Sequence, residues 1–253
     1  MARVNKGLDV SSYNPKLDYA NIGKQIDFAI LRAGFTGYGA SRSLNTDFSF
    51  EKHYAGFTAQ KTPLGVYYYS CADSVDEAIR EAKYLLTLLK GKKFLYPIYM
   101  DVEDEFNQQK LTKTELSKVV LAFCKVLEDA GYYAGIYANS NWWTNELDQS
   151  DLKTLDRWVA HYGVPTPRVS GEMWQYTEDG VLNGHTGKLD LNYCYKDYPV
   201  IIQNAGLNGW GVPVNTPKIL IKGEMVSGDV TGKVELVKSL MELLGFTVTV
   251  EVN

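Results

Sequence analysis

The chain has 253 residues, of which 45% are hydrophobic and 22% charged, and this ordinary globular composition excludes a disordered or collagen-like protein. Its net charge of −4 provides no surplus of positive charge for a phosphate backbone, so we expect no nucleic-acid partner. The cysteines are odd in number and widely spaced, which predicts neither a disulfide framework nor a zinc site.

The N-terminal sequence MARVNKGLDV lacks the apolar stretch of a signal peptide. No apolar run elsewhere approaches the ~20 residues that are needed to cross a bilayer. We therefore expect a protein that is made in a reducing cytoplasm and has no membrane partner. A role outside the cell would need another route of export, such as release through a holin, or a leader that is missing from this sequence.

The aromatic residues are unevenly distributed along the chain. All 18 tyrosines lie at or before Tyr198, and beyond it the only aromatic residues are Trp210 and Phe246. This shift in composition predicts a domain boundary near residue 200. We divide the chain into an aromatic-rich domain over residues 1–200, a linker over 201–216 and a small module over 217–253.

Short apolar runs rich in β-branched and aromatic residues predict eight strands in the first domain. In chain order these runs end at Val10, Phe35, Ser70, Glu103, Asn139, Gly163, Glu178 and Tyr195. A helix with a capping box at Ser74 and Glu77 follows the third strand, and a second, opened by Thr112 and Glu115, follows the fourth.

This alternation of strands and helices favours a parallel β/α architecture. The later intervals, of roughly ten residues, are too short for a crossover helix, so the last strands are expected to return as hairpins. The sequence therefore predicts an α/β fold, an irregular eight-stranded β/α (TIM-like) barrel with a partly antiparallel last third. An open doubly wound sheet is the alternative, but the glycine-rich phosphate fingerprint that it often carries is absent.

Acidic residues lie where predicted strands end, which in a parallel barrel is the mouth that carries the chemistry. They are Asp9, Asp101, Glu103 and Asp190. The spacing of Asp101 and Glu103 puts both side chains on one face of a strand. Crowded carboxylates raise the pKa of one group and leave another ionised, as a glycosidase requires. A single acid of this kind is more often a turn cap or a surface charge.

Aromatic residues also recur near the ends of the predicted strands. They are Tyr67, Tyr69, Tyr99, Tyr137 and Trp174. Their flat faces can stack on pyranose rings, and their polar groups can bond sugar oxygens. The alternative is that they only fill the barrel interior. Tyr68, between two of them, is expected to point outward against the helices.

Other kinds of site have little support. His53, His161 and His185 lack metal-ligand spacing, so we expect neither a metal nor another cofactor. There is no Gly-x-Ser-x-Gly elbow, and Cys71 has no visible histidine partner for nucleophilic catalysis. Paired carboxylates remain the best candidates.

Six motifs in order resemble those of glycoside hydrolase family 25, the Chalaropsis-type lysozymes that are frequent among phage endolysins and bacterial autolysins. They are Gly7–Tyr13 (GLDVSSY), Phe28–Gly34 (FAILRAG), Gly65–Tyr69 (GVYYY), Tyr99–Glu103 (YMDVE), Trp174–Tyr176 (WQY) and Leu189–Asn192 (LDLN). The resemblance runs from about Lys6 to about Tyr195. It implies an irregular β/α barrel that cleaves the β-1,4 bond between N-acetylmuramic acid and N-acetylglucosamine in peptidoglycan, without a metal.

The resemblance also implies residue roles. Glu103 matches the general acid/base, and Asp9, Asp101 and Asp190 complete the acidic cluster. Trp174, Tyr67 and Tyr137 are implied to line the sugar groove, and Arg32 of the second motif is included among the substrate-binding candidates. Since the cleaved sugar carries an acetamido group, we hypothesise a retaining, substrate-assisted route in which Asp101 orients that amide.

Two other functions fit the same residues. One is a catalytically silent barrel that uses the aromatic groove only to bind sugar, although the intact acids argue against it. The other is a chitinase-like enzyme, whose longer acidic strand signature is absent.

The sequence of the module over 217–253 predicts a βαβ element, with strands over 217–222 and 246–252 around a helix. Fewer than about 40 residues provide too small a core for independent stability. We expect the module to bind the cell wall, to form a homo-oligomer or to dock on the barrel.

Overall fold

The computed structural model describes residues 4–37 and 42–211. These residues comprise the barrel and the short segment at its C-terminal end. The βαβ module predicted over residues 217–253 lies outside the described residues.

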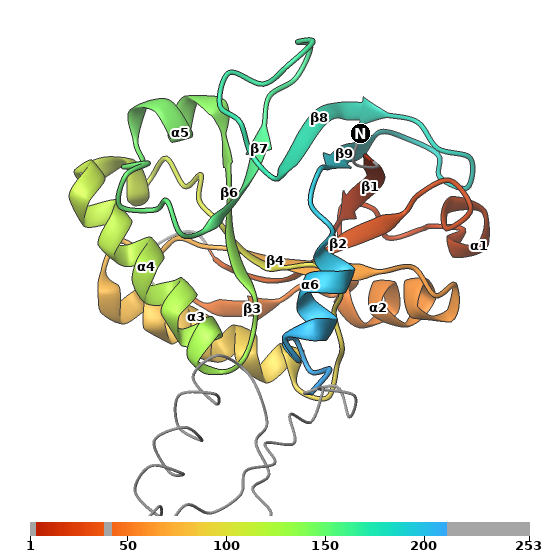
Figure 1. Ribbon diagram of the computed structural model, residues 1–253, viewed down its shortest axis with the longest axis horizontal. Helices are drawn as coiled ribbons and strands as arrows, with labels where there is room; N and C mark the ends of the chain where they lie inside the picture. The colour runs from red at the N-terminus through yellow and green to blue at the C-terminus, as the bar shows by residue number, and fades with distance from the viewer. Residues whose placement is uncertain (1–3, 38–41, 212–253) are drawn as a thin grey trace, which may run out of the picture.

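Eight strands close into a barrel (Figure 1). In chain order they are β1 (Asn5–Val10), β2 (Phe28–Thr36), β4 (Leu64–Tyr69), β5 (Ile98–Asp101), β6 (Ala134–Asn139), β7 (Asp156–Ala160), β8 (Met173–Gly180) and β9 (Leu189–Cys194). The ring closes because β1 pairs with both β2 and β9. A short strand, β3 (Leu44–Thr46), pairs with β2 outside the ring. The predicted α/β barrel is confirmed.

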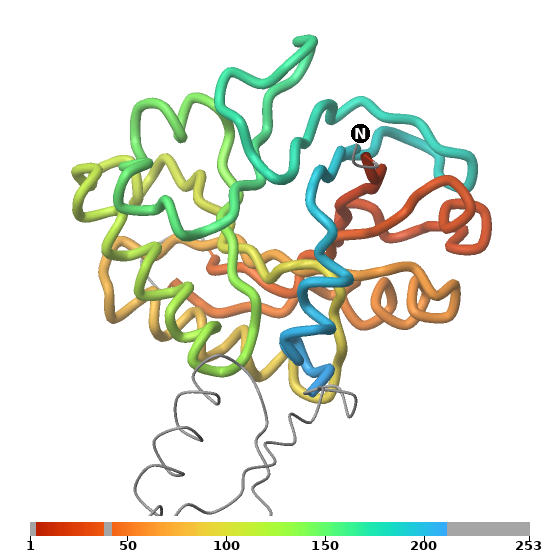
Figure 2. Tube along the Cα trace, viewed as in Figure 1, coloured from red at the N-terminus to blue at the C-terminus, as the bar shows by residue number. Residues whose placement is uncertain are grey.

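The strands of the ring are parallel from β1 to β8, and only β9 runs in the opposite direction. The antiparallel character predicted for the last third is therefore confirmed at β9. The hairpin expected between β7 and β8 is wrong, because Trp158 pairs in parallel with Met173. The connection over residues 161–172 projects from the barrel and returns to the start of β8 as a long loop without a helix (Figure 2).

Helices surround the parallel part of the barrel. They are α1 (Tyr19–Ile22), α2 (Phe50–Ala59), α3 (Val75–Leu89), α4 (Lys113–Asp129), α5 (Ser140–Asn145), α6 (Tyr198–Asn204) and a 3₁₀ turn at Gln108–Lys110. Ser74 caps α3 by accepting from the Glu77 N–H, and Thr112 and Glu115 form the predicted capping box of α4. Within residues 4–37 and 42–211, no helix is both long and apolar enough to cross a membrane.

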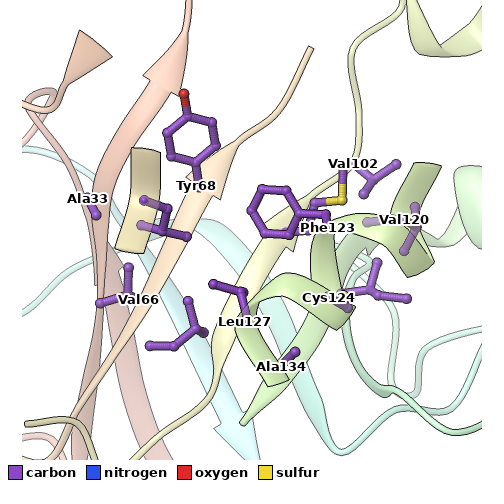
Figure 3. Close-up of a cluster of buried hydrophobic side chains, with 14 of the residues drawn as sticks. Ala33, Val66, Tyr68, Val102, Val120, Phe123, Cys124, Leu127 and Ala134 are labelled. Carbon is purple, nitrogen blue, oxygen red and sulfur yellow. The ribbon is translucent and has the colours of Figure 1, made fainter. Parts of the chain in front are cut away.

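The core has two parts, one outside and one inside the ring of strands. Outside, Val66 and Tyr68 of β4 pack against Phe123 and Leu127 of α4 (Figure 3). Tyr68 is fully buried there, as its outward orientation predicts. Inside the ring, large aromatic side chains fill the barrel below its mouth. They include Phe28, Tyr96, Tyr99 and Trp158.

The segment after residue 200 packs against the bottom of the barrel. Ile202 of α6 is buried in the interior cluster. The side chain of Asn208 donates to the carbonyl of Tyr96 and accepts from the backbone N–H of Tyr133. The first part of the predicted linker is therefore bound to the barrel, and the folded unit extends beyond residue 200.

A buried carboxylate, Glu81 of α3, ties this helix to the ends of two strands. It accepts hydrogen bonds from the hydroxyls of Thr36 (2.6 Å) and Ser70 (2.5 Å) and from the N–H of Cys71 (3.2 Å). Burial raises its pKa to about 7. Between the ordinary value of 4.5 and 7, the folded state binds a proton more tightly than the unfolded state, so the contribution of this group to stability falls as pH rises.

We expect Glu81→Ala to lower the free energy of unfolding by about 3 kcal/mol, because it removes the acceptor of several buried donors. Urea unfolding at pH 6 measures this change. Glu128→Ala, at an exposed position on α4, is the matched control and should change stability by less than about 0.5 kcal/mol. Equal stability of the two variants would show that this network is not needed.

Candidate active site

A cleft with a volume of about 1090 Å³ opens at the mouth of the barrel, where the parallel strands end. Most of the candidates predicted from the sequence line it. These are Asp9, Arg32, Tyr67, Tyr69, Asp101, Glu103, Tyr137 and Asp190. Two predicted candidates, Tyr99 and Trp174, do not line it.

Strand pairing brings the acids together. Asp9, near the end of β1, is the direct partner of Asp190 in the antiparallel ladder with β9. Side chains of such a pair lie on the same face, with Cβ atoms about 5 Å apart. Because β9 is reversed, its beginning lies at the mouth where the other strands end. Asp101 ends β5, and Glu103 follows two residues later on the same side of the cleft.

Two amides hold the carboxylate of Asp9. Gln175 Nε2 and Asn192 Nδ2 donate to its Oδ2 atom over 2.9 and 2.7 Å. Asn192 Oδ1 accepts from Trp158 Nε1 (2.8 Å), and since an indole N–H can only donate, the amide orientation of Asn192 is fixed. The NH₂ group of Asn192 is therefore the end that faces Asp9.

The hydroxyls of Tyr137 and Tyr162 fix Gln175 in a similar way. Both donate to Gln175 Oε1, over 2.9 and 2.6 Å. This leaves the Gln175 NH₂ group to face Asp9. Both amides therefore donate to the Asp9 carboxylate. This arrangement favours the anionic form of Asp9.

Electrostatic effects on Asp9 and Asp101 oppose this preference. Burial raises the pKa of Asp9, and repulsion from Asp190 raises it further, while the amides of Asn192 and Gln175 lower it. Burial and repulsion from Glu103 likewise raise the pKa of Asp101, and the guanidinium of Arg32 lowers it. Two crowded, buried acids thus compete for negative charge, and the amides give Asp9 an advantage that Asp101 lacks.

Glu103 and Asp190 have pKa values in the neutral range. Burial, with repulsion from Asp190 and Glu105, raises the pKa of Glu103 to about 7. Burial and repulsion from Glu178 raise the pKa of Asp190 to about 6. Of these two groups, Glu103 therefore retains its proton to the higher pH, as a general acid requires.

Arg32 is anchored at one side of the cleft. Its Nε atom lies 2.7 Å from the buried carboxylate of Asp47, and its Nη2 atom donates to Ser12 Oγ over 2.7 Å. Its guanidinium also lies against the rings of Tyr13 and Phe35. This fixed cation attracts the carboxylate of Asp101.

The structure corrects the placement of Tyr99 and Trp174. Tyr99 points into the barrel two residues before Asp101 and is fully buried beneath Trp158, whose ring centroid is 5.1 Å away. Trp174 lies next to Gln175, which faces the interior, so strand alternation directs Trp174 outward. There it packs beside Tyr176 and Tyr193 and donates to the His161 carbonyl.

Several cleft residues were missed by the sequence analysis. Tyr13 and Phe48 line the cleft with 83% and 78% of their surface exposed, and each presents an aromatic face to solvent. Both lie in connections whose course the local pattern does not reveal. Gln175 and Asn192 were also missed, although alternation could have found Gln175 beside Trp174.

The described part of the chain holds no group of three or more His, Cys, Asp or Glu side chains arranged to bind a metal ion. Cys71, Cys124 and Cys194 are buried and unpaired. The histidines form hydrogen bonds with other groups of the protein. The Nδ1 atom of His53, for example, lies 2.9 Å from the Tyr19 hydroxyl oxygen.

A β/α barrel whose mouth holds a proton-retaining glutamate among several crowded aspartates, with exposed aromatic faces, has the arrangement of a glycoside hydrolase. The sequence pattern of the family described as "Glycosyl hydrolases family 25" matches residues 8–185. The chain belongs to this family. Asp190 lies just beyond the matched segment, and its place in the site rests on its pairing with Asp9.

Known proteins with similar sequence or structure agree with this assignment. The chain is 25% identical over 192 residues to the "Autolytic lysozyme" of Clostridium acetobutylicum, covering 74% of this chain and 55% of that protein. It therefore spans about half the length of this curated relative.

Two solved structures share the fold. The spore cortex lytic enzyme SleM of Clostridium perfringens has a TM-score of 0.68 at 22% identity, covering 76% of this chain and 67% of that one. The bacterial lysozyme of Streptomyces coelicolor has a TM-score of 0.68 at 20% identity, covering 82% and 98%.

Proposed function

We propose that this protein is a peptidoglycan hydrolase, a lysozyme that cleaves the β-1,4 bond between N-acetylmuramic acid and N-acetylglucosamine. The observation that carries the proposal is Glu103, a partly buried carboxyl with a pKa of about 7 in an aromatic cleft beside several aspartates. The autolytic lysozyme of Clostridium acetobutylicum, a relative of this chain, supports the choice of substrate.

Glu103 is the proposed general acid. Its protonated carboxyl donates to the oxygen that leaves the anomeric carbon as the glycosidic bond breaks. The positive charge that develops on the sugar ring is stabilised by the Asp9 anion, which Gln175 and Asn192 hold in place. These amides need no reorganisation during the reaction.

Asp101 is proposed to act through the acetamido group of the substrate. Its Oδ1 atom is buried without a hydrogen-bond partner among the described residues, so it is available to accept the amide N–H. The acetamido oxygen then attacks the anomeric carbon and forms a cyclic oxazolinium ion as the leaving sugar departs. Water opens this ion from the opposite face and returns a proton to Glu103, which gives net retention. Trapping a covalent glycosyl ester on Asp101 or Asp9 would contradict this route.

The biological role we propose is that of a phage endolysin, which acts on the cell wall after export or holin-assisted release. The chain resembles in fold the catalytic domain of an endolysin from a Listeria monocytogenes phage, with a TM-score of 0.65. Wall binding or self-association by the residues after 217 is part of the same proposal.

Release of reducing ends from purified cell walls, with loss of turbidity, tests the proposed activity. A catalytically silent sugar-binding barrel would bind walls without releasing reducing ends or lowering the turbidity. A chitinase-like enzyme would cleave chitin oligomers in preference to walls.

The activity should depend on pH in a bell shape. The rising limb is expected near pH 6, where the paired acids Asp9 and Asp190 begin to ionise and supply the anion that the mechanism needs. The falling limb is expected near pH 7, where Glu103 loses its proton. kcat/KM measured on a soluble peptidoglycan fragment from pH 4 to 9 checks this. Glu178→Gln removes a charge that raises the pKa of Asp190, so the rising limb should move to lower pH. Full activity at pH 9 would contradict the role of Glu103.

A further inference from the structure

A second cavity, with a volume of about 1010 Å³, adjoins the cleft. The charged side chains that line it are mostly basic, whereas those of the cleft are mostly acidic. Tyr13, Asn14 and Lys188 line both spaces, so they are continuous. One wall is the segment after β1, and the other is the connection between β8 and β9 over residues 183–188.

The charges of the two spaces differ. The cleft is lined by six carboxylates, with Arg32 and Lys188 as its only cations among the described residues. The second cavity is lined by Lys16, Lys52 and Lys188, with Asp18 as its only acid in the described chain. The acidic cleft therefore leads directly into a basic space.

The lone acid of the second cavity and one of its lysines are already engaged. Asp18 caps α1, where its carboxylate accepts from the backbone N–H and the side-chain amide of Asn21. Lys188 forms an exposed ion pair with Asp179 over 2.5 Å. Lys16 makes no side-chain bond within residues 4–37 and 42–211, so its charge is available to a ligand.

Hydrogen bonds join the two walls and hold the cavity open. The N–H of Asp18 donates to the Gly184 carbonyl over 2.8 Å. His185 Nδ1 lies 3.0 Å from the Lys16 carbonyl, which can only accept, so this nitrogen carries the proton. Lys52 Nζ donates to the Pro15 carbonyl over 2.7 Å. These contacts place the cations around a defined space.

We propose that this basic cavity binds carboxylates of the peptide stem attached to muramic acid. The inference rests on the proposed function. The glycan itself is built of neutral rings, whereas the stem leaves the lactyl group of muramic acid and carries free carboxylates. A stem directed past Tyr13 and Asn14 leaves the acids of the cleft, which repel it, and reaches Lys16 and Lys52, which attract it.

The test compares two soluble substrates prepared from the same walls, freed of phosphate-containing polymers. One consists of glycan strands that retain their peptide stems, and the other of strands from which an amidase has removed the stems. We expect Lys16→Glu to raise KM for the stem-bearing strands by about tenfold at low salt, without a change in kcat. The stem-free strands keep only the lactyl carboxylate that the amidase leaves on each muramic acid, so their KM should change much less.

Lys83→Glu, at an exposed position on α3, is the matched control because it makes the same charge change outside both spaces. It should leave both substrates unaffected. Equal effects of Lys16→Glu on the two substrates, or no effect on either, would overturn the proposal. Failure of the unmodified protein to cleave either polymer would instead overturn the proposed function.

Discussion

Replacing Glu103 with glutamine is expected to lower kcat for wall hydrolysis by about 10³-fold or more. The glutamine side chain has the same shape but cannot transfer a proton to the leaving oxygen. Release of reducing ends from purified walls measures the loss. The fold should survive, because the substitution removes a partly buried acid whose anionic form is disfavoured by loss of solvent.

The matched control is Glu105→Gln, which changes an exposed acid two residues away. Its charge contributes to the raised pKa of Glu103, so a small shift of the pH profile is expected and no large loss of activity. Near-full activity of Glu103→Gln with an unchanged thermal unfolding midpoint would show that another group donates the proton.

Replacing Asp9 with asparagine is expected to lower kcat by about 10²- to 10³-fold, a loss typical of removing one electrostatic stabiliser of a transition state. The amide oxygen of the new side chain can still accept from Gln175 and Asn192, so its position is kept. The negative charge that stabilises the sugar cation is lost. Single-turnover kinetics on a labelled peptidoglycan fragment separates this effect from substrate binding.

Asp129→Asn, on the exposed face of α4, is the control for the loss of one aspartate charge and should retain full activity. If Asp9→Asn raised KM and left kcat unchanged, Asp9 would be a binding residue. Its proposed action on the transition state would then be wrong.

Strand periodicity accounts for much of what the sequence could predict. Alternation placed Tyr68 against the helices and put Asp101 and Glu103 at the same mouth, because side-chain direction in a strand depends only on local geometry. The capping boxes predicted the start of α3 and α4 for the same reason. The same rule, applied to the Trp174–Gln175 pair, would have placed Trp174 outside the barrel.

The remaining features depend on contacts between distant segments. The parallel pairing of β7 with β8 results from closure of the ring and cannot be inferred from a loop of that length. Tyr13 and Phe48 lie at the cleft only because their connections fold over the mouth. The network around Asp9 joins β1, β8 and β9, and Asn192 has no local sequence signal that distinguishes it from a surface asparagine.

The position of the bond that is cut tests the central claim most directly. Purified peptidoglycan is digested, the new reducing ends are reduced with borohydride, and the products are examined by mass spectrometry. A lysozyme leaves muramic acid at the new end, so we predict fragments that end in N-acetylmuramitol. Fragments that end in N-acetylglucosaminitol, or no new reducing ends, would contradict the account.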